Sequence, residues 1–578
     1  MRLGLFYIII FYFFSFSLSA QDCWQKASGD KKLANDYFSY QMYPCALKEY
    51  IILHAGKKES KKYNRRIAQC YINSPGGNKS KAIKYLEFLI KAGKTEDKVY
   101  LELGIALLHD KQFDRALKNF DTYIGLVNPK GFELKEIETL KENAIFSKEL
   151  IKHPVNVTFK NLGKDVNSVY NDKHPFITDK EDFIMFTSDR KGVRGGFEDG
   201  DGYVPDVMLA KVKKGKDAFK GSRSMSGSFS TEFDEFVAGG SPDGSYFIYA
   251  TNEQFQQFDL KITYKAPKKR SYPSSSFMQS LNGRNSHEMS ATITNDGSLI
   301  IFSSDRKGGY GGFDLWMSKR LPNGTWGNPI NMGPSINTNL DENFPNFSED
   351  ENYITFSSDG LKGMGGFDLF KTEFSEDLKS WTKPANLGHP INSAYDDFTI
   401  IFVKNGRYAY KSMIRSDSYG MRDLYRLTFN DVLPTYTVVK SSILVDTLVD
   451  LDRLTEEITN EVSILERELD SLKENQADQA LIDTAQKKYF KSMNALNQFD
   501  PKTNNKIEVT AEDGTLYGKY AANARNGKFI MILEPGVYQI SIINDGFEPY
   551  SKKVRIYDKM NYTPEFNRSF YLKPKSNL

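Results

Sequence analysis

Apolar residues recur every three or four positions through the first 150 residues, which is the spacing of helices that bury one face. In residues 100–120 the larger residues are interleaved with small ones at Gly104 and Ala116, and the same arrangement occurs twice before. Ala46, Ala82 and Ala116 are 36 and 34 residues apart. The pattern predicts three helical repeats in residues 21–150, the last followed by a helix near 133–150. Such a solenoid offers a concave surface to a partner, or it simply braces the domain that follows.

Between residues 155 and 430 the pattern changes to short runs in which apolar residues alternate with Ser and Thr, which is typical of antiparallel strands. An Asp-apolar pair recurs there at steps of 53, 55, 54 and 55 residues. About 54 residues suffice for one four-stranded blade, so the sequence predicts a five-bladed β-propeller. The pairs are Asp206-Val207, Asp259-Leu260, Asp314-Leu315, Asp368-Leu369 and Asp423-Leu424.

An asparagine pattern predicts how this propeller closes. The segments at 331–338 and 386–393 each carry Asn-x-Gly followed by a second Asn, and each precedes a blade. Residues 161–168 carry the same pattern before the first blade. We therefore expect residues 155–168 to supply the outer strand of the last blade, which protects open sheet edges.

Carboxylates recur once per blade at Asp189, Asp305 and Asp359. Repetition argues against catalysis, which needs one asymmetric site, and an Asp in a Gly-rich turn usually accepts backbone N–H bonds. The acidic loop with Glu198, Asp199 and Asp201 is unique to the first blade and is a weak Ca²⁺ candidate. It lacks the EF-hand pattern, so a solvated loop is the favoured interpretation, and no metal or other cofactor is expected.

After Pro434, residues 435–445 have the pattern of a strand, and leucines then recur at helical spacing. A polar break divides residues 446–498 into two runs, which predicts a helical hairpin. Alternating strand patterns follow, so residues 435–575 are expected to form a β-sandwich into which the hairpin is inserted. The predicted fold class is a multidomain α and β chain: α-solenoid, propeller, then sandwich.

The N-terminal segment indicates that this chain is exported. Residues 1–20 have one cation, an apolar stretch and Leu18-Ser19-Ala20, the layout of a secretory signal peptide. The 77 Lys and Arg residues nearly balance 74 Asp and Glu residues, so no excess of positive charge indicates a nucleic-acid partner.

Cys23 follows a poor lipobox, so lipidation is not expected. Cys45 and Cys70 could form a disulfide in an oxidising compartment, or both could be buried free thiols.

The motifs resemble known families. The helical frame is similar to tetratricopeptide repeats, and units such as FSSDRKGGYGGFDLW (302–316) resemble WD-like, TolB-type propeller repeats. Residues 507–510, 526–529, 533–538 and 546–550 resemble carboxypeptidase regulatory-like domains. The three modules in this order are similar to PorE-type accessories of the Bacteroidota. This resemblance implies a periplasmic, outer-membrane-associated protein of type IX secretion or gliding, with a PorP/SprF-like β-barrel as partner.

Two departures from that family limit what the resemblance implies. The chain stops at Leu578 without the OmpA-like domain with which such proteins usually continue, so no peptidoglycan binding is expected. The helical hairpin is an addition, which suggests a different attachment.

The sequence fits three classes of function unequally: a scaffold, an enzyme and a ligand-binding propeller. A non-enzymatic scaffold fits best, because the modules are of interaction type. The sequence shows no Gly-x-Ser-x-Gly elbow with suitably placed partners, no HExxH motif and no Cys-His neighbourhood, so an enzyme is not expected. A glycan- or peptide-binding propeller for nutrient capture is the alternative, and it would need aromatic platforms such as Trp316, Trp326 or Trp381 on one face. The six histidines stand in unrelated contexts: His54, His109, His153, His174, His287 and His389.

Overall fold

The computed structural model describes residues 27–575 with internal gaps. The gaps are 75, 94, 195, 197–202, 214–217, 255–256, 266–271, 376–379, 405, 433–435, 446–450, 499–504 and 557–564. The described residues divide into two compact units. One holds a helical region (31–150) and a five-sheet region (157–429), and the other holds the remaining helices and strands, so the chain mixes helical and antiparallel-sheet segments.

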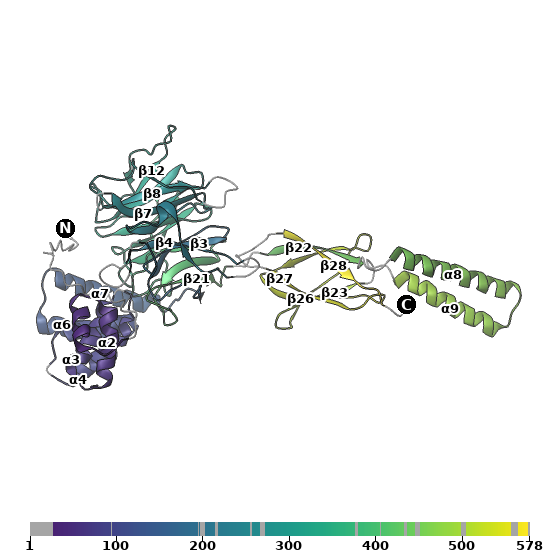
Figure 1. Ribbon diagram of the computed structural model, residues 1–578, viewed down its shortest axis with the longest axis horizontal. Coiled ribbons are helices and arrows are strands. Elements are labelled where there is room, and N and C mark those ends of the chain that lie inside the picture. The colour runs from purple at the N-terminus through teal and green to yellow at the C-terminus, as the bar shows by residue number, and fades with distance from the viewer. Residues whose placement is uncertain are drawn as a thin grey trace. The chain divides into compact units, whose positions relative to one another are not determined.

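The helical region consists of short helices that each pack on the next one along the chain (Figure 1, purple and blue). Asp30 and Ser60 cap the first and third helices by accepting backbone N–H bonds. The small residues of the repeating pattern, Ala46, Ala82 and Ala116, have no exposed surface, so they lie where helices approach closely. The helices are α1 (Lys31–Ser39), α2 (Tyr43–Ala55), α3 (Lys61–Asn73), η1 (Lys79–Ala82), α4 (Ile83–Lys91), α5 (Lys98–His109), α6 (Phe113–Val127) and α7 (Phe132–Leu150).

Gly104 of α5 provides a test of this close packing. A Cβ atom there would lie 2.4 Å from Phe120 of α6. We expect Gly104→Ala to destabilise the helix pair by about 1–3 kcal/mol through overpacking, although alanine has the better helix propensity. Amide hydrogen exchange of the α5 and α6 peptides in the intact chain measures the effect.

Gly125 of α6 is the matched control, because it is exposed and a Cβ atom there meets nothing within 4 Å. Gly125→Ala should slow exchange or leave it unchanged, with a gain of up to about 1 kcal/mol. Faster exchange in both variants would show that close packing at Gly104 is not the cause.

The five-sheet region is built from antiparallel strands that follow one another in each sheet. The sheet orders are β2-β3-β4-β5, β6-β7-β8-β9, β10-β11-β12-β13, β14-β15-β16-β17 with β18 on β16, and β1-β21-β20-β19. Strands of each sheet contact the next sheet, and β2 of the first contacts β19, β20 and β21 of the fifth. Apolar layers fill the spaces between consecutive sheets, as in the cluster around Phe247 and Tyr249.

The strand bounds follow the repeating pattern. They are β1 (Val157–Asn161), β2 (Asp172–Ile177), β3 (Phe183–Ser188), β4 (Asp206–Lys211), β5 (Arg223–Ser224), β6 (Glu235–Gly240), β7 (Tyr246–Gln254), β8 (Gln257–Tyr264), β9 (Ser276–Phe277), β10 (Glu288–Ile293) and β11 (Leu299–Ser304). They continue as β12 (Asp314–Lys319), β13 (Ile330–Asn331), β14 (Glu342–Phe347), β15 (Tyr353–Ser358), β16 (Asp368–Ser375), β17 (Ser380–Trp381), β18 (Ala385–Asn386), β19 (Ile400–Val403), β20 (Tyr408–Met413) and β21 (Asp423–Phe429). A 3₁₀ turn, η2 (Gly227–Phe229), precedes β6.

The fifth sheet joins distant parts of the chain. Its outer strand β1 pairs with β21 from Val157 opposite Phe429 to Asn161 opposite Tyr425. Asn167 fixes this junction, since its side chain accepts from the N–H of Leu424 at 2.8 Å and donates to the Leu424 carbonyl at 3.0 Å. Asn337 makes the same two bonds to Leu315. The asparagine pattern therefore marks one repeated contact, and in the fifth sheet this contact closes the region on itself.

The second unit has two sheets around one apolar core that includes Val439, Met531 and Ile540 (Figure 1, green and yellow). The sheet orders are β25-β22-β28, in which β22 and β28 are parallel, and β24-β23-β26-β27. Between β22 and β23 the chain forms two helices that pack on each other. The elements are β22 (Thr437–Val445), α8 (Leu451–Glu474), α9 (Gln479–Gln498), β23 (Lys506–Ala511), β24 (Leu516–Tyr520), β25 (Lys528–Leu533), β26 (Gly536–Ile543), β27 (Tyr550–Ile556) and β28 (Glu565–Leu572).

Candidate functional site

The repeated carboxylates of the Ser-Asp turns are structural. Asp189, Asp305 and Asp359 each accept the backbone N–H of the residue 18 positions earlier, at 2.8, 2.6 and 2.8 Å. In the second sheet Asn252 takes this place and accepts from the N–H of Asp234. An amide that replaces the carboxylate shows that charge is not needed at this position. This is the role that an Asp in such a turn was expected to have.

In the third, fourth and fifth sheets, the aspartate that begins the third strand along the chain holds the Gly-rich turn before it. Asp314 accepts from the N–H groups of Tyr310 and Gly311, at 2.6 and 3.1 Å. Asp368 accepts from Met364 and Gly365 in the same way, at 2.7 and 3.0 Å. In these sheets the Asp of the Asp-apolar pair therefore supplies the acceptor that a turn of this shape needs.

A third set of carboxylates lies at the start of the first strand of each sheet or, for Asp397, three residues before it, and the sequence patterns above do not single this set out. The members are Asp172, Glu235, Glu288, Glu342 and Asp397, none of which is more than 2% exposed. Most accept hydrogen bonds from a Ser or Thr four residues earlier, as Asp397 does from the N–H and hydroxyl of Ser393 at 2.7 and 2.9 Å. A Ser or Thr four residues before an acidic residue, repeated in four of the five sheets, is the sequence signal that could have revealed the set.

Three of these five buried carboxylates pair with a cation, and two do not. The ion pairs are Arg190–Asp172, Arg306–Glu288 and Lys411–Asp397. No ion pair to Glu235 or Glu342 occurs among the described residues. Burial raises the pKa of Glu235 and of Glu342 to about 7 each, although Thr231 and Ser358 donate hydrogen bonds to them. Both glutamates are therefore largely protonated in mildly acidic solution.

His174 lies at the centre of an aromatic cluster rather than at a reactive site. Its ring stacks on Phe344 with 4.4 Å between centroids, and it also lies close to Phe236 and Phe398. Burial holds its pKa well below the ordinary value, so the imidazole is neutral. Trp316 is likewise a packing residue, since it is 7% exposed and donates its Nε1–H to the Ser304 carbonyl.

The helical region contacts the end of the five-sheet region that carries the Gly-rich turns. The Asn143 amide of α7 donates to the carbonyl of Gly365 at 2.7 Å. Tyr395, which precedes the first strand of the fifth sheet, accepts from the N–H of Lys79, and the His109 ring packs on Tyr395 at 4.3 Å. Burial lowers the pKa of His109 to about 3, so this contact forms with neutral imidazole. Part of that end is therefore covered by helices.

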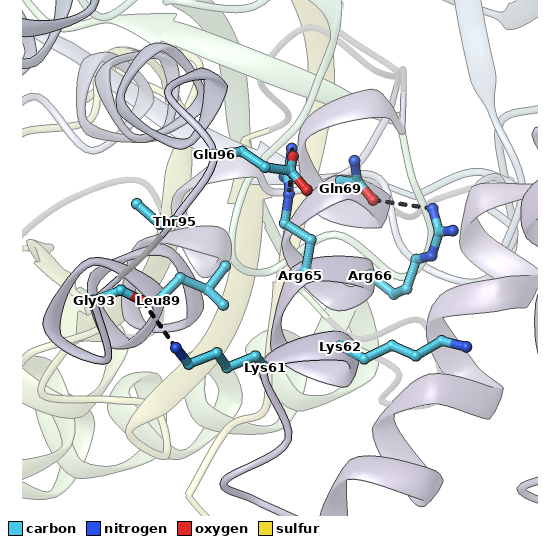
Figure 2. A pocket seen from close by; sticks show the side chains of 9 residues that line it. All are labelled: Lys61, Lys62, Arg65, Arg66, Gln69, Leu89, Gly93, Thr95 and Glu96. Atoms are coloured by element: carbon cyan, nitrogen blue, oxygen red, sulfur yellow. Dashed lines mark hydrogen bonds and ion pairs between the residues drawn. The ribbon is translucent and has the colours of Figure 1, made fainter.

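A cavity lined mainly by charged and polar side chains lies in the helical region. It has a volume of about 340 Å³, at the lower end of the range of roughly 300–1,000 Å³ for ligand pockets. One wall is α3, whose residues at i, i+4 and i+7 share a helix face. The opposite wall is Leu89 of α4 and the α4–α5 loop (Figure 2). The lining residues are Lys61, Lys62, Arg65, Arg66, Gln69, Leu89, Gly93, Thr95 and Glu96.

Four cations and one carboxylate line this cavity, which we call the α3 pocket. Arg65 bonds to Glu96 in the α4–α5 loop and to Glu102 of α5 (Figure 2 shows the Glu96 pair). The guanidinium of Arg66 lies 4.0 Å from the centre of the Phe38 ring of α1. Burial raises the pKa of Glu102, which the Arg65 hydrogen bond opposes. The excess of positive charge suits an anionic ligand.

The site residues predicted from the sequence have different outcomes. The Cys45–Cys70 pair does not form: Cys70 of α3 is a buried free thiol, whereas Cys45 of α2 is in a disulfide. Burial raises the pKa of the Cys70 thiol to about 12, so it is unreactive at neutral pH. Cys23, considered for lipidation, lies outside the described residues. So does the candidate Ca²⁺ loop with Glu198, Asp199 and Asp201.

The described part of the chain offers neither a metal-binding cluster nor a helix that could span a membrane. No group of three or more His, Cys, Asp or Glu side chains there is placed to hold a metal ion. No described helix combines the length and hydrophobicity that crossing a membrane requires.

No protein-family model matches the chain, and no curated protein sequence matches it. Solved structures resemble parts of it weakly. TolB from Acinetobacter baumannii is 14% identical with a TM-score of 0.30, covering 52% of this chain and 71% of its own. An α-L-arabinofuranosidase from Lactobacillus brevis is 12% identical (TM-score 0.29; 46% and 92% covered). An α-L-arabinanase from Penicillium chrysogenum is 8% identical (TM-score 0.29; 48% and 100% covered). Scores this low carry no argument about function.

Proposed function

We propose that this protein is a non-enzymatic periplasmic scaffold, associated with the outer membrane. In this proposal α1–α7 form a tetratricopeptide-type solenoid and the five sheets form a five-bladed propeller. The second unit is then a regulatory-like sandwich that carries the α8–α9 hairpin. The partner is a PorP/SprF-like outer-membrane β-barrel, and the process served is type IX secretion or gliding. No nucleic acid or cofactor takes part in this proposal.

One observation carries the proposal: the repeated polar groups of the five-sheet region serve its own structure. Asp314 and Asp368 hold turns, while Asp172 and Asp397 are buried in ion pairs. A region whose carboxylates are bonded internally offers binding surface rather than reacting groups. The α3 pocket, in contrast, has an excess of cations that internal carboxylates do not balance.

A second candidate, a glycan- or peptide-binding propeller in nutrient capture, is favoured by two exposed tyrosines. Tyr310 and Tyr419 are 53% and 44% exposed in equivalent Gly-rich turns of two sheets. Aromatic rings presented in this way are suitable for stacking on a ligand. Trp316, in contrast, is packed inside its sheet and is not available as a platform.

Affinity purification with cross-linking from detergent-solubilised outer membranes tests the scaffold. We expect one β-barrel protein in stoichiometric yield, cross-linked to this chain. Recovery of oligosaccharide without a protein partner would contradict the scaffold and favour the second candidate. Hydrolysis of a peptide or glycan by the purified chain would contradict the non-enzymatic assignment.

A further inference from the structure

The four cationic side chains of the α3 pocket differ in the number and kind of contacts that they make with the rest of the protein. Lys61 donates its Nζ to the carbonyls of Ala92 and Gly93, at 2.9 and 2.8 Å, and so caps the end of α4. Lys62, one position further along α3, is exposed. Arg66 combines its contact with the Phe38 ring with one 3.2 Å bond to Gln69. Lys62 and Arg66 therefore have no carboxylate partner among the described residues.

Arg65 has one fixed partner and one exchangeable partner. The Glu102 side chain is only 6% exposed, so its bond to Arg65 is internal to the helical region. The Glu96 side chain is 69% exposed and lies in the α4–α5 loop. Its Oε2 atom accepts from both Nε and Nη2 of Arg65, at 3.1 and 3.0 Å. Since exposed ion pairs contribute little to stability, a competing anion can displace Glu96 at small cost.

The geometry at Arg65 indicates which anion would replace Glu96. The group that occupies this guanidinium edge in the structure is itself a carboxylate, held through a single oxygen atom. A carboxylate that used both oxygens would make the two parallel bonds that arginine favours. Leu89 supplies an apolar wall for the methylene groups of an incoming side chain. Lys62 and Arg66 add positive charge along the same helix face.

We propose that the α3 pocket binds an acidic segment of a partner protein, with a carboxylate of that segment replacing Glu96 on Arg65. Lys62 and Arg66 hold the neighbouring carboxylates of the segment. Glu96 acts as an internal competitor that occupies Arg65 until the segment arrives, and Glu102 keeps the guanidinium in position. This inference rests on the proposed scaffold function and names the chemistry of one partner contact.

Fluorescence anisotropy of a fluorescein-labelled hexaglutamate peptide with the full-length protein tests the proposal. Removing the competitor with Glu96→Gln should tighten binding about threefold to fivefold, because an exposed ion pair no longer opposes the peptide. The double variant Lys62→Ala/Arg66→Gln should weaken binding by about tenfold or more, since charge-assisted hydrogen bonds are lost. Lys118→Ala/Lys135→Ala on α6 and α7 is the matched control: it removes two exposed cations outside the pocket and should change binding less than about twofold.

Three outcomes would overturn the proposal. The first is that Glu96→Gln leaves binding unchanged or weakens it. The second is that the double variant behaves like Lys118→Ala/Lys135→Ala, which would mean that binding follows net charge alone. The third is that inorganic phosphate displaces the peptide more effectively than unlabelled hexaglutamate does. Because the probe is synthetic, these results are independent of whether the cross-linking experiment recovers a β-barrel, so the failures of the two proposals can be told apart.

Discussion

Lys411→Met is expected to destabilise the five-sheet region by about 3–5 kcal/mol. The Lys411 side chain has no exposed surface, and its ion-pair partner Asp397 is 2% exposed. Methionine fills a similar volume but leaves the Asp397 carboxylate buried without a cation. Arg422 is the other cation near Asp397, but it is held by the Asp396 carbonyl. Urea unfolding followed by tryptophan fluorescence measures the effect, since Trp316, Trp326 and Trp381 all lie in this region.

The double variant Lys411→Met/Asp397→Asn separates charge from packing. Asparagine can still accept the two Ser393 hydrogen bonds that Asp397 accepts, and it carries no charge. If the unpaired carboxylate causes the loss, the double variant should recover most of the lost stability. A double variant no more stable than Lys411→Met would mean that the lysine acts through packing and not through its charge.

The stability of the five-sheet region should fall as the pH rises from about 4.5 to about 7. Glu235 and Glu342 keep their protons up to about pH 7 in the folded protein, whereas the unfolded chain releases them near the ordinary value of 4.5. A raised folded-state pKa gives stability that is complete below the unfolded pKa and lost as the pH passes the folded one. Each glutamate accounts for about 3 kcal/mol at most. The urea midpoint, measured in steps between pH 5 and pH 8, reports the fall.

Glu342→Gln isolates the contribution of Glu342 to the pH dependence of stability. Glutamine is neutral at every pH in this range, and it can still accept hydrogen bonds from the Ser358 and Thr338 hydroxyls. The variant should lose part of the pH dependence and become more stable than the wild-type chain at pH 8. A wild-type midpoint that stays constant or rises over this range would contradict the prediction. An unchanged slope in the variant would assign the effect to other buried carboxylates, such as Asp368, whose pKa burial raises to about 7.

The positions of the sheets along the chain could be predicted mainly from the spacing of the repeated motifs. The Asp-apolar pairs locate the third strand of each sheet, and in three sheets the turn before that strand uses the carboxylate as its acceptor. The strand expected from residues 155–168 is β1, paired with β21. The buried carboxylates near the first strands were missed because their type varies between Asp and Glu, as in Asp172 and Glu235, and because three of them pair with a cation whereas two do not.

The α3 pocket could not be predicted, because its residues look like the solvated face of an amphipathic helix. Only the position of the α4–α5 loop turns Lys62 and Arg66 into one wall of a cavity. The Cys45–Cys70 pairing failed for a related reason. Two cysteines on neighbouring helices pair only if their Cβ atoms approach within about 4.5 Å, and sequence separation does not encode that distance.

The pairing of β1 with β21 determines how the protein would respond to mechanical load. The helical region enters this strand pair at Val157, and the chain leaves toward the second unit at Phe429, the residue directly opposite. Tension between the two therefore acts on adjacent ends of one antiparallel pair, so its hydrogen bonds are loaded one after another. The bonds at this end of the pair are loaded first: Asn430 donates to Asn156 through its backbone at 3.0 Å and its side chain at 2.9 Å, and the Asn156 amide donates to Asp431 at 2.7 Å. Under such tension we expect these bonds to break before the hydrogen bonds that join β1 to β21.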